Sequence, residues 1–417
     1  MNLWKKILLL LPFWVYALFF KFGAALHFSL LSWLGSQVMP IWIVGILIGV
    51  GSFVQLILDV PTGYLLDRFG YVKIMQVGAF LFIIGGLVLL FGLSINTFYL
   101  TLLFSTFGWL TFGPGSNAYV LSSAPRGQGG RFMGLYHMVA SAGVVLSAIG
   151  VIIALQVSIP HIAIFISSVI MVAFVALFFV VRPKYSVHQE KNSVHHHYYI
   201  RRHFFHRLLL KINALRPAFS ILSIQYFVGS IFYASIWFVL PLILASQVHN
   251  SALGLGLSVF DLSIVLLGSY LGKLADRLNN KKLVFCGLLV FALMSAASGF
   301  NLTIWFLVFG FLSTAGDELS EVSLWSWINR LERNHDQDGS LSGIVILFGD
   351  LGYAVGPIFA GILYETMGPE WTIAICAAPI GILWICYSYM NLPRRQALAT
   401  PIGSEMPERV FRFRHKH

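Results

Sequence analysis

The sequence predicts an all-α integral membrane protein with twelve transmembrane helices in two halves. The composition, the number of long apolar segments and a loop that recurs half a chain later all point to this fold class. Apolar residues make up 58% of the 417 residues and charged residues only 10%, and the mean hydropathy is +0.82. Soluble domains typically have about 25% charged residues. In lipid, helices of this composition are stable because they satisfy their own backbone polar groups.

Twelve apolar segments are each long enough to cross about 30 Å of hydrocarbon. In chain order we expect helices over 8–35, 41–66, 74–94, 97–121, 131–156, 160–181, 217–245, 252–274, 283–299, 302–328, 341–366 and 371–391. The first segment is too long for the apolar part of a signal peptide and lacks a small-residue cleavage site, so we expect it to remain as a membrane helix. The predicted domains are six-helix bundles over 1–182 and 217–392, a basic, His-rich linker over 183–216 and a basic tail over 393–417.

Lysine and arginine occur in every second connection. They precede the first segment and follow the second, fourth, sixth, eighth, tenth and twelfth, whereas the intervening loops contain none. This alternation predicts a multi-pass protein of the plasma or inner membrane with both termini in the cytoplasm. The net charge of +11 is then explained by contact with anionic lipid and requires no nucleic-acid partner.

The remaining polar motifs do not indicate a metal site or an enzyme. Six histidines lie in the linker, and such a tract could bind metal. Because no carboxylate or cysteine accompanies them at a fixed spacing, we favour a basic segment on the membrane surface over a metal-binding tract. Cys286, Cys376 and Cys386 lie in apolar segments and are expected to be core residues without disulfides. Nucleotide-binding, nucleophile-elbow and HExxH motifs do not occur. We therefore expect no cofactor, no metal, no enzymatic activity and no direct use of ATP.

The recurring loop is Gly63-Tyr64-Leu65-Leu66-Asp67-Arg68-Phe69-Gly70, repeated in part as Gly272-Lys273-Leu274-Ala275-Asp276-Arg277. Two copies at half-chain spacing indicate two homologous halves. With this loop after helices two and eight, the chain resembles the major facilitator superfamily over nearly its whole length. The resemblance implies two six-helix bundles with a central substrate cavity near the midplane, and alternating access by rocking of the halves.

The resemblance also implies that the loops form a cytoplasmic gate. The candidate gate residues are Asp59, Gly63, Asp67, Arg68, Gly70, Lys73, Gly272, Asp276, Arg277 and Lys282. Gly70 permits a turn, and Asp67 is expected to lie against the positive N-terminus of helix eleven near residues 338–340. By the repeat, Asp276 is expected to face the start of helix five. Asn279 replaces the second glycine of the motif, which weakens the second copy as a gate.

Ionisable residues inside apolar segments are costly and are functional candidates by default. Helix ten contains Asp317, Glu318 and Glu321, which lie on neighbouring faces, with Asp317 about fifteen residues from the outer end. Carboxylates this close in a low dielectric cannot all be ionised, as a proton-coupling site requires; a cationic substrate or metal ion could use the same cluster. Further candidates for the coupling or substrate cavity are Asp261, Asp350, Lys21 and His27, and each of Asp261, Asp317 and Asp350 is a possible partner for Lys21.

Helix eleven contains Gly352, Gly356, Pro357 and Gly361, which are expected to allow close packing and a kink. Two markers of drug exporters are missing, because helix four contains no arginine and helix five no Gly-Pro pair. A drug exporter therefore stays a possible interpretation, but its two most specific sequence motifs do not support it.

We expect a secondary transporter, with proton-coupled export of small amphipathic or cationic compounds first, because acidic groups and aromatic residues would share the cavity. The aromatic candidates are Phe20, Tyr233, Trp237, Phe348 and Tyr353. One alternative is proton-coupled uptake of a nutrient or organic anion, with Lys21 as counter-charge. Another is a non-transporting membrane receptor or assembly factor on the same fold. The expected partners are a small-molecule substrate, protons and membrane lipid, and we expect a monomer.

Overall fold

The computed structural model describes residue 8 and residues 10–123, 129–180, 216–246, 256–300, 304–331 and 338–390. Within these ranges the chain forms twelve long α-helices and no strand, which confirms the predicted fold class. The first half contains α2 (Leu11–Ser36), α3 (Ile41–Phe69), α4 (Tyr71–Val88) with the 3-10 turn η1 (Leu89–Phe91), α5 (Ile95–Ser123), α6 (Gly129–Ala154) and α7 (Ile159–Val180). The second half contains α9 (Arg216–Ser246), α11 (Gly256–Arg277), α12 (Asn280–Phe300), α13 (Ile304–Leu331), α14 (Asp338–Met367) and α15 (Pro369–Tyr389).

Among the described helices, eight are long and apolar enough to cross a membrane by length and composition. The described parts of α6 and α11 contain shorter apolar stretches, Met138–Ala154 and Ser258–Gly268, and α5 and α13 are not among the eight. Of these, α13 has three acidic residues near its middle, and a charged side chain in hydrocarbon is unfavourable unless it faces protein or water. The acidic residues of α13 are therefore expected to face protein or water instead of lipid.

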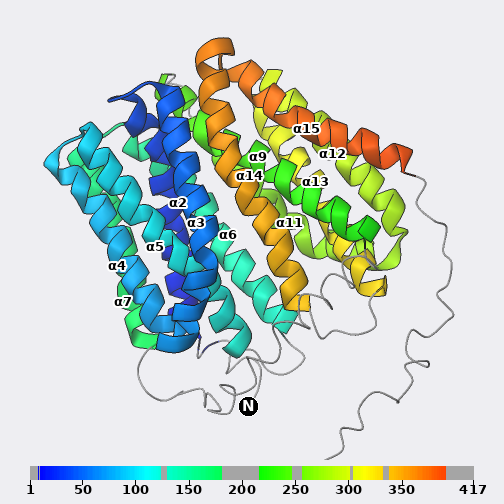
Figure 1. Cartoon of the computed structure of the whole chain (residues 1–417), viewed down its shortest axis with the longest axis horizontal. Helices are drawn as coiled ribbons and strands as arrows, with labels where there is room; N and C mark the ends of the chain where they lie inside the picture. The colour runs from blue at the N-terminus through cyan, green and yellow to red at the C-terminus, as the bar shows by residue number, and fades with distance from the viewer. Residues whose placement is uncertain are drawn as a thin grey trace, which may run out of the picture.

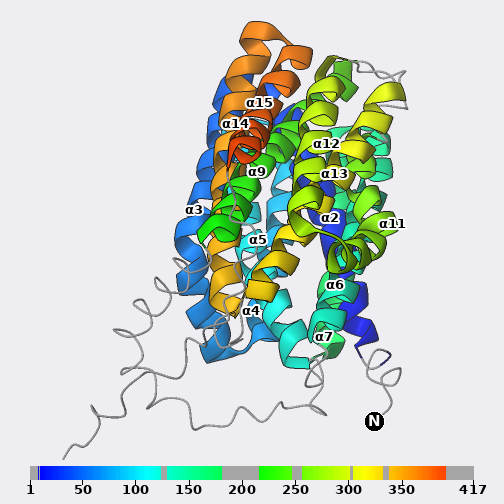
Figure 2. The ribbon, with the colours of Figure 1, turned by 90° about the vertical axis from the view of Figure 1, so that its right-hand side faces the viewer.

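The two halves form two bundles that lie side by side, with helices α2–α7 in the first bundle and α9–α15 in the second (Figure 1). In the view turned by 90°, the helices of both bundles run along a common direction (Figure 2). The first bundle is centred on α2, whose Phe13, Tyr16 and Phe20 are fully buried. Between the bundles, α3 packs on α14, α6 on α11 and α2 on α9.

The turns at Gly70 and Asn279 mark one end of the molecule, called here the motif end; the opposite end is the distal end. Close contacts between the bundles lie toward the distal end. A Cβ placed on Gly45 of α3 would overlap the carbonyl oxygen of Pro357 and lie 3.2 Å from the Cα of Gly361. Nearby, the Trp42 backbone N–H donates to Glu365 Oε1 at 3.3 Å. The bundles are thus closed against each other at the distal end.

Helix α14 packs closely between α9 and α3 at the four residues that the sequence analysis selected on it, Gly352, Gly356, Pro357 and Gly361. Gly352 and Gly356 face α9, where an added Cβ would lie 2.7 Å from Ser230 Cβ and 2.8 Å from Ala234 Cβ, respectively. Pro357 and Gly361 face α3. Small residues allow helix backbones to approach this closely in a membrane.

The two motif loops turn by different means. Gly70 has a φ of +92°, a conformation that favours glycine, and its N–H donates to Leu66 O at 2.9 Å. At the second loop, Asn279 Oδ1 instead accepts the backbone N–H of Lys281 at 3.0 Å, so a side chain caps the start of α12. The asparagine that departs from the motif therefore still supports a turn.

Four charged gate candidates are exposed, namely Arg68, Lys73, Arg277 and Lys282, and Asp59 on α3 is half-buried. Gly272 lies on α11, where an added Cβ would be 3.9 Å from the Val322 side chain. The side chains of Asp67 and Asp276 and the environment of Gly63 lie outside the described residues, as do the linker up to residue 215 and the tail from residue 391. The gate contacts expected for Asp67 and Asp276 therefore stay predictions.

Candidate functional site

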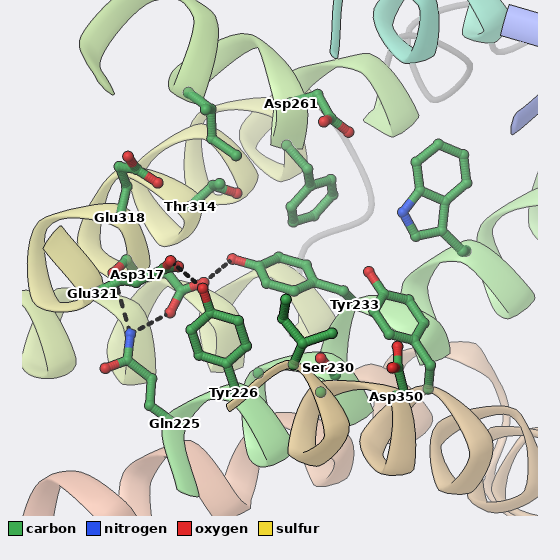
Figure 3. Close-up of a pocket in the computed structure, with 17 residues that line it drawn as sticks. Gln225, Tyr226, Ser230, Tyr233, Asp261, Thr314, Asp317, Glu318, Glu321 and Asp350 are labelled. Carbon is green, nitrogen blue, oxygen red and sulfur yellow. Dashed lines mark hydrogen bonds between the residues drawn. The ribbon is translucent and has the colours of Figure 1, made fainter. Parts of the chain in front are cut away.

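A cavity of about 320 Å³ lies within the second bundle and is lined by side chains from α9, α11, α13 and α14 (Figure 3). Five carboxyl groups line it, and they are the five that the sequence analysis selected for the coupling or substrate cavity: Asp261, Asp317, Glu318, Glu321 and Asp350. Its aromatic lining consists of Tyr226, Tyr233, Trp237, Phe260 and Tyr353. Folding thus brings together acids that are up to 89 positions apart in the chain.

Asp317 is the fourteenth of the 28 residues of α13, so it lies at mid-helix as predicted. Gln225 Nε2 donates to its Oδ1 at 2.7 Å, and the Tyr233 hydroxyl donates to its Oδ2 at 2.9 Å (Figure 3). Both donors are neutral and both belong to α9. They orient the carboxyl group without neutralising its charge.

Gln225 is a site residue that the sequence analysis missed. It is 1% exposed, and its Nε2 also donates to the carbonyl oxygen of Asp317 at 3.2 Å and to Ser320 Oγ at 2.7 Å. These bonds fasten α9 to α13 at the level of Asp317. The sequence signal that could have identified Gln225 is its polar amide in an otherwise apolar segment. Amides are less unfavourable in a membrane than carboxylates, so their presence there is weaker evidence for a functional site.

Glu318 and Glu321 extend the acidic side of α13. The Tyr226 hydroxyl donates to Glu321 Oε1, while Glu318 faces Gly268 of α11, where an added Cβ would lie 3.6 Å from Glu318 Oε1. Glu318 is close enough to both Glu321 and Asp317 for their charges to repel. Since no basic side chain occurs among the described lining residues, a proton or a cationic ligand is needed to balance this charge.

Asp261 is one of the cavity acids that face the first bundle. It forms a side-chain hydrogen bond with Ser141 of α6 and interacts electrostatically with Lys21 of α2. The Lys21 ammonium lies over two aromatic rings of α5, 4.6 Å from the centroid of Trp109 and 5.4 Å from that of Phe112. Of the three partners that the sequence left open for Lys21, the structure brings Asp261 to it.

Asp350 of α14 is a second cavity acid that faces the first bundle. Its carboxyl group interacts electrostatically with Asp59 of α3. Asp59 was assigned to the gate from its position in the sequence, and the structure brings it near a cavity acid of the other bundle. Both side chains are half-buried, so their mutual repulsion is only partly screened.

His27 lies in the interior of the first bundle and is not among the lining residues. It is fully buried, a hydrogen bond of 2.7 Å joins its Nε2 to Ser105 Oγ, and its ring centroid lies 5.1 Å from that of Phe82. Phe20 is also remote from the lining, stacked on Phe112 at 4.3 Å. Of the predicted aromatic wall, Tyr233, Trp237 and Tyr353 line the cavity and Phe348 does not. Within the described ranges, no three His, Cys, Asp or Glu side chains are arranged to hold a metal ion.

Twelve described helices in two bundles, with an acidic cavity within the second bundle, define a multi-pass membrane protein of the transporter type. A sequence model described as Major Facilitator Superfamily matches residues 7–228 and again residues 222–413. The chain therefore belongs to this superfamily, whose members include secondary transporters.

Curated relatives include "Multidrug resistance protein MdtG" of Citrobacter koseri, which is 25% identical over 319 residues and covers 74% of this chain and 75% of the relative. The protein of the same name from Salmonella arizonae is 25% identical over 323 residues, covering 75% and 76%. A solved POT family transporter in complex with a thioalcohol-conjugated peptide superposes with a TM-score of 0.66 at 12% identity, covering 91% of this chain and 95% of that one. Another POT family transporter, in complex with 5-aminolevulinic acid, superposes with a TM-score of 0.64 at 13% sequence identity, covering 90% of this chain and 94% of that one. At these identities the structures show similarity of fold alone.

Proposed function

We propose that this secondary transporter exports small cationic or amphipathic compounds in exchange for protons. The observation that carries the proposal is the lining of the 320 Å³ cavity, in which five carboxyl groups face five aromatic side chains. Carboxylates attract a cation, and aromatic faces stabilise it further while they bury its apolar part. Curated relatives are named multidrug resistance protein, which supports export as the direction of transport.

Exchange follows from competition for the same negative charge. An ionised carboxylate cluster in low dielectric is unfavourable without a positive partner. A cationic substrate provides that partner when it is bound, and a proton provides it after the substrate has left. Asp317 is the best candidate for the shared group, because it lies at mid-helix and its only described side-chain partners, Gln225 and Tyr233, are neutral.

The pattern of lysine and arginine supports placing the motif end in the cytoplasm. With that orientation, the close contacts of α3 with α14 block the external side, and the substrate would enter the cavity from the cytoplasm. A conformation with these contacts released would present the same cavity to the outside. We propose that the protein functions in this way as a monomer of the plasma or inner membrane with both termini in the cytoplasm.

Uptake of an organic anion is less well supported. Lys21, the basic residue that would bind the anion, is not among the described lining residues, and its charge interacts with Asp261. The described lining therefore provides negative charge and no basic side chain. An anion would have to bind where the electrostatic potential is least favourable to it.

The proposal can be tested with protein reconstituted into liposomes that contain a pH-sensitive dye. Addition of tetraphenylphosphonium, a lipophilic cation, should cause proton movement with the wild type and little or none with Asp317→Asn. The matched control is Glu370→Gln, which removes an exposed carboxylate in the first turn of α15 and should leave the flux unchanged.

Three other outcomes would contradict parts of the proposal. Wild-type flux in Asp317→Asn would remove Asp317 from the coupling mechanism. Flux that is triggered by small organic anions and lost in Lys21→Gln would indicate uptake instead of export. Binding of ligands by folded protein without any flux would support the receptor alternative.

A further inference from the structure

We infer that a substrate binds in this cavity in one orientation, with its cationic group at the acids of α13 and its apolar part against Trp237. Trp237 is then a specificity-determining residue, and the preferred substrate is an elongated cation with its charge at one end and an aromatic or apolar group at the other. The inference rests on the proposed function, because it requires that the cavity accept cations.

The cavity extends along α9, which contributes lining residues over three turns. These residues are Gln225, Tyr226, Gly229, Ser230, Tyr233 and Trp237. Positions 225, 229, 233 and 237 are four apart, so they lie on one face of the helix. Gln225 and Trp237 are separated by twelve positions, which corresponds to about 18 Å along the helix axis. The lining is therefore long in one direction.

Helix α9 runs from the motif end toward the distal end. Helix α11 ends just before the turn at Asn279, so its first residue, Gly256, lies toward the distal end. An added Cβ on Gly256 would lie 3.2 Å from Leu240 Cδ2, near the C-terminal end of α9. Trp237 precedes Leu240 by one turn. It therefore lies toward the distal end of the cavity, and Gln225 lies toward the motif end.

The three acids of α13 are held beside the N-terminal part of α9. Gln225 Nε2 donates to Asp317 Oδ1 at 2.7 Å, and the Tyr226 hydroxyl donates to Glu321. Figure 3 shows Glu318 on the same side of the cavity as these groups. Within the described ranges, hydrogen bonds engage Asp317 and Glu321 but not the carboxyl group of Glu318. This end of the cavity thus concentrates negative charge and leaves one carboxyl group available to a cation.

The opposite end of the cavity is aromatic. The ring centroids of Tyr233 and Phe260 are 6.1 Å apart, and both residues line the cavity. Trp237 is one turn beyond Tyr233 toward the distal end, is half-buried, and also lines the cavity. Aromatic faces stabilise the apolar part of a ligand by burial and by ring contacts.

This separation of charge from aromatic surface favours one orientation of an amphipathic cation. In the reverse orientation, the apolar part would lie among the three acids of α13 and remove water from them without balancing their charge, which is unfavourable. The cationic group would then have one lining acid of α11, Asp261, instead of three. A short cation can reach the acids of α13 but not Trp237, whereas a longer one can reach both. The cavity should therefore select for length.

The test is equilibrium binding of two quaternary cations to purified wild type and variants. In benzyltrimethylammonium the ring and the charge are adjacent, and in phenylhexyl-trimethylammonium a hexyl chain separates them. Trp237→Ala should raise the Kd of the long cation on the order of tenfold, as expected for loss of a large aromatic contact, and leave that of the short cation unchanged. Trp237→Phe, which keeps a ring, should retain most of the affinity for the long cation. Should Trp237→Ala not fold, Trp237→Gln carries the same prediction.

Two further variants control for the loss of a tryptophan and for the position of the charge. Trp305→Ala should change neither Kd, because Trp305 of α13 is 54% exposed and is not among the described lining residues. Glu318→Gln should weaken both cations by a similar factor, since both place their charge at α13. Its effect on the long cation should add to that of Trp237→Ala, because the two side chains contact opposite ends of the ligand.

Two results would overturn the inference while the proposed function stands. One is an equal effect of Trp237→Ala on the short and long cations, or no effect on either. The other is a loss of affinity for the short cation that is larger in Asp261→Asn than in Glu318→Gln, which would indicate the reverse orientation. Absence of binding of both cations by the wild type would overturn the inference and the proposed function together.

Discussion

Replacement of Gly45 by alanine should open the distal end of the molecule. The new Cβ would overlap the carbonyl oxygen of Pro357 and lie 3.2 Å from the Cα of Gly361. Both neighbours are backbone atoms of α14, so no side-chain rotation can relieve the overlap. Relief requires that α3 and α14 separate, and separation of these helices is the movement that opens this end.

The expected size follows from the cost of overpacking, which is about 1–3 kcal/mol when extra atoms enter a well-packed contact. This cost applies only to the conformation in which α3 and α14 touch. The equilibrium should therefore shift about 5- to 150-fold toward the conformation with the distal end open.

Electron–electron distance measurements between two spin labels can detect the shift. Suitable label positions are Phe91 at the distal end of the first bundle and Trp371 at that of the second, which are 88% and 54% exposed. Cys286, Cys376 and Cys386 would first be replaced so that only the two labels react. The variant should show a larger population at the longer distance.

Gly381→Ala of α15 is the matched control, because its added Cβ meets no atom within 4 Å. It should leave the distance distribution unchanged. If Gly45→Ala also left it unchanged in protein that is folded, the glycine contact between α3 and α14 would not be what holds the distal end closed.

Two further substitutions test the local structure. Gly70→Ala forces an L-residue into a φ of +92° and should destabilise the protein by about 1–2 kcal/mol. The control is Gly113→Ala, whose added Cβ meets nothing within 4 Å, and Gly70→Ala should have the lower thermal midpoint of the two. Ser105→Ala removes the hydrogen bond to buried His27 and should cost about 1–3 kcal/mol without affecting binding of cations. Its control is Ser147→Ala, since the described hydrogen bond of the Ser147 hydroxyl goes to the Val144 carbonyl oxygen of its own helix at 2.7 Å. Equal midpoints for these two serine variants would argue against the prediction.

The fold was predictable because each membrane helix is encoded locally. A run of apolar residues with the length of the hydrocarbon layer defines a helix whatever its neighbours are, and predicted and observed ends agree to within a few residues for helices such as α3, α7 and α9. The end of α4 differs, since it closes in the 3-10 turn η1 before Gly92, which has a φ of +90°. Apolar periodicity carries no signal for that change of helix type.

The sequence predicted how far along its helix each candidate residue of the site lies, but not which way its side chain faces. Charge in an apolar segment selected Asp317, which lines the cavity, and Lys21, which is not among the described lining residues. Helical spacing placed Glu318 and Glu321 beside Asp317. The same reasoning included His27, which lies at a similar depth but turns toward Ser105 and Phe82 in the first bundle. Which face a helix presents depends on its neighbours, so the partners of Lys21 could be narrowed only by the tertiary structure.

The two bundles share a fold but differ in what their contacts can do during transport. In rigid-body rocking, contacts within a bundle persist, so the bonds of Gln225 and Tyr233 to Asp317 would hold in every conformation. The attraction of Lys21 to Asp261 and the repulsion between Asp59 and Asp350 act between different bundles. A ligand can shift a conformational equilibrium only through an interaction that differs between the two states. Binding at Asp317 therefore has to act on conformation through groups such as Asp261 and Asp350, which face the cavity and the other bundle at once.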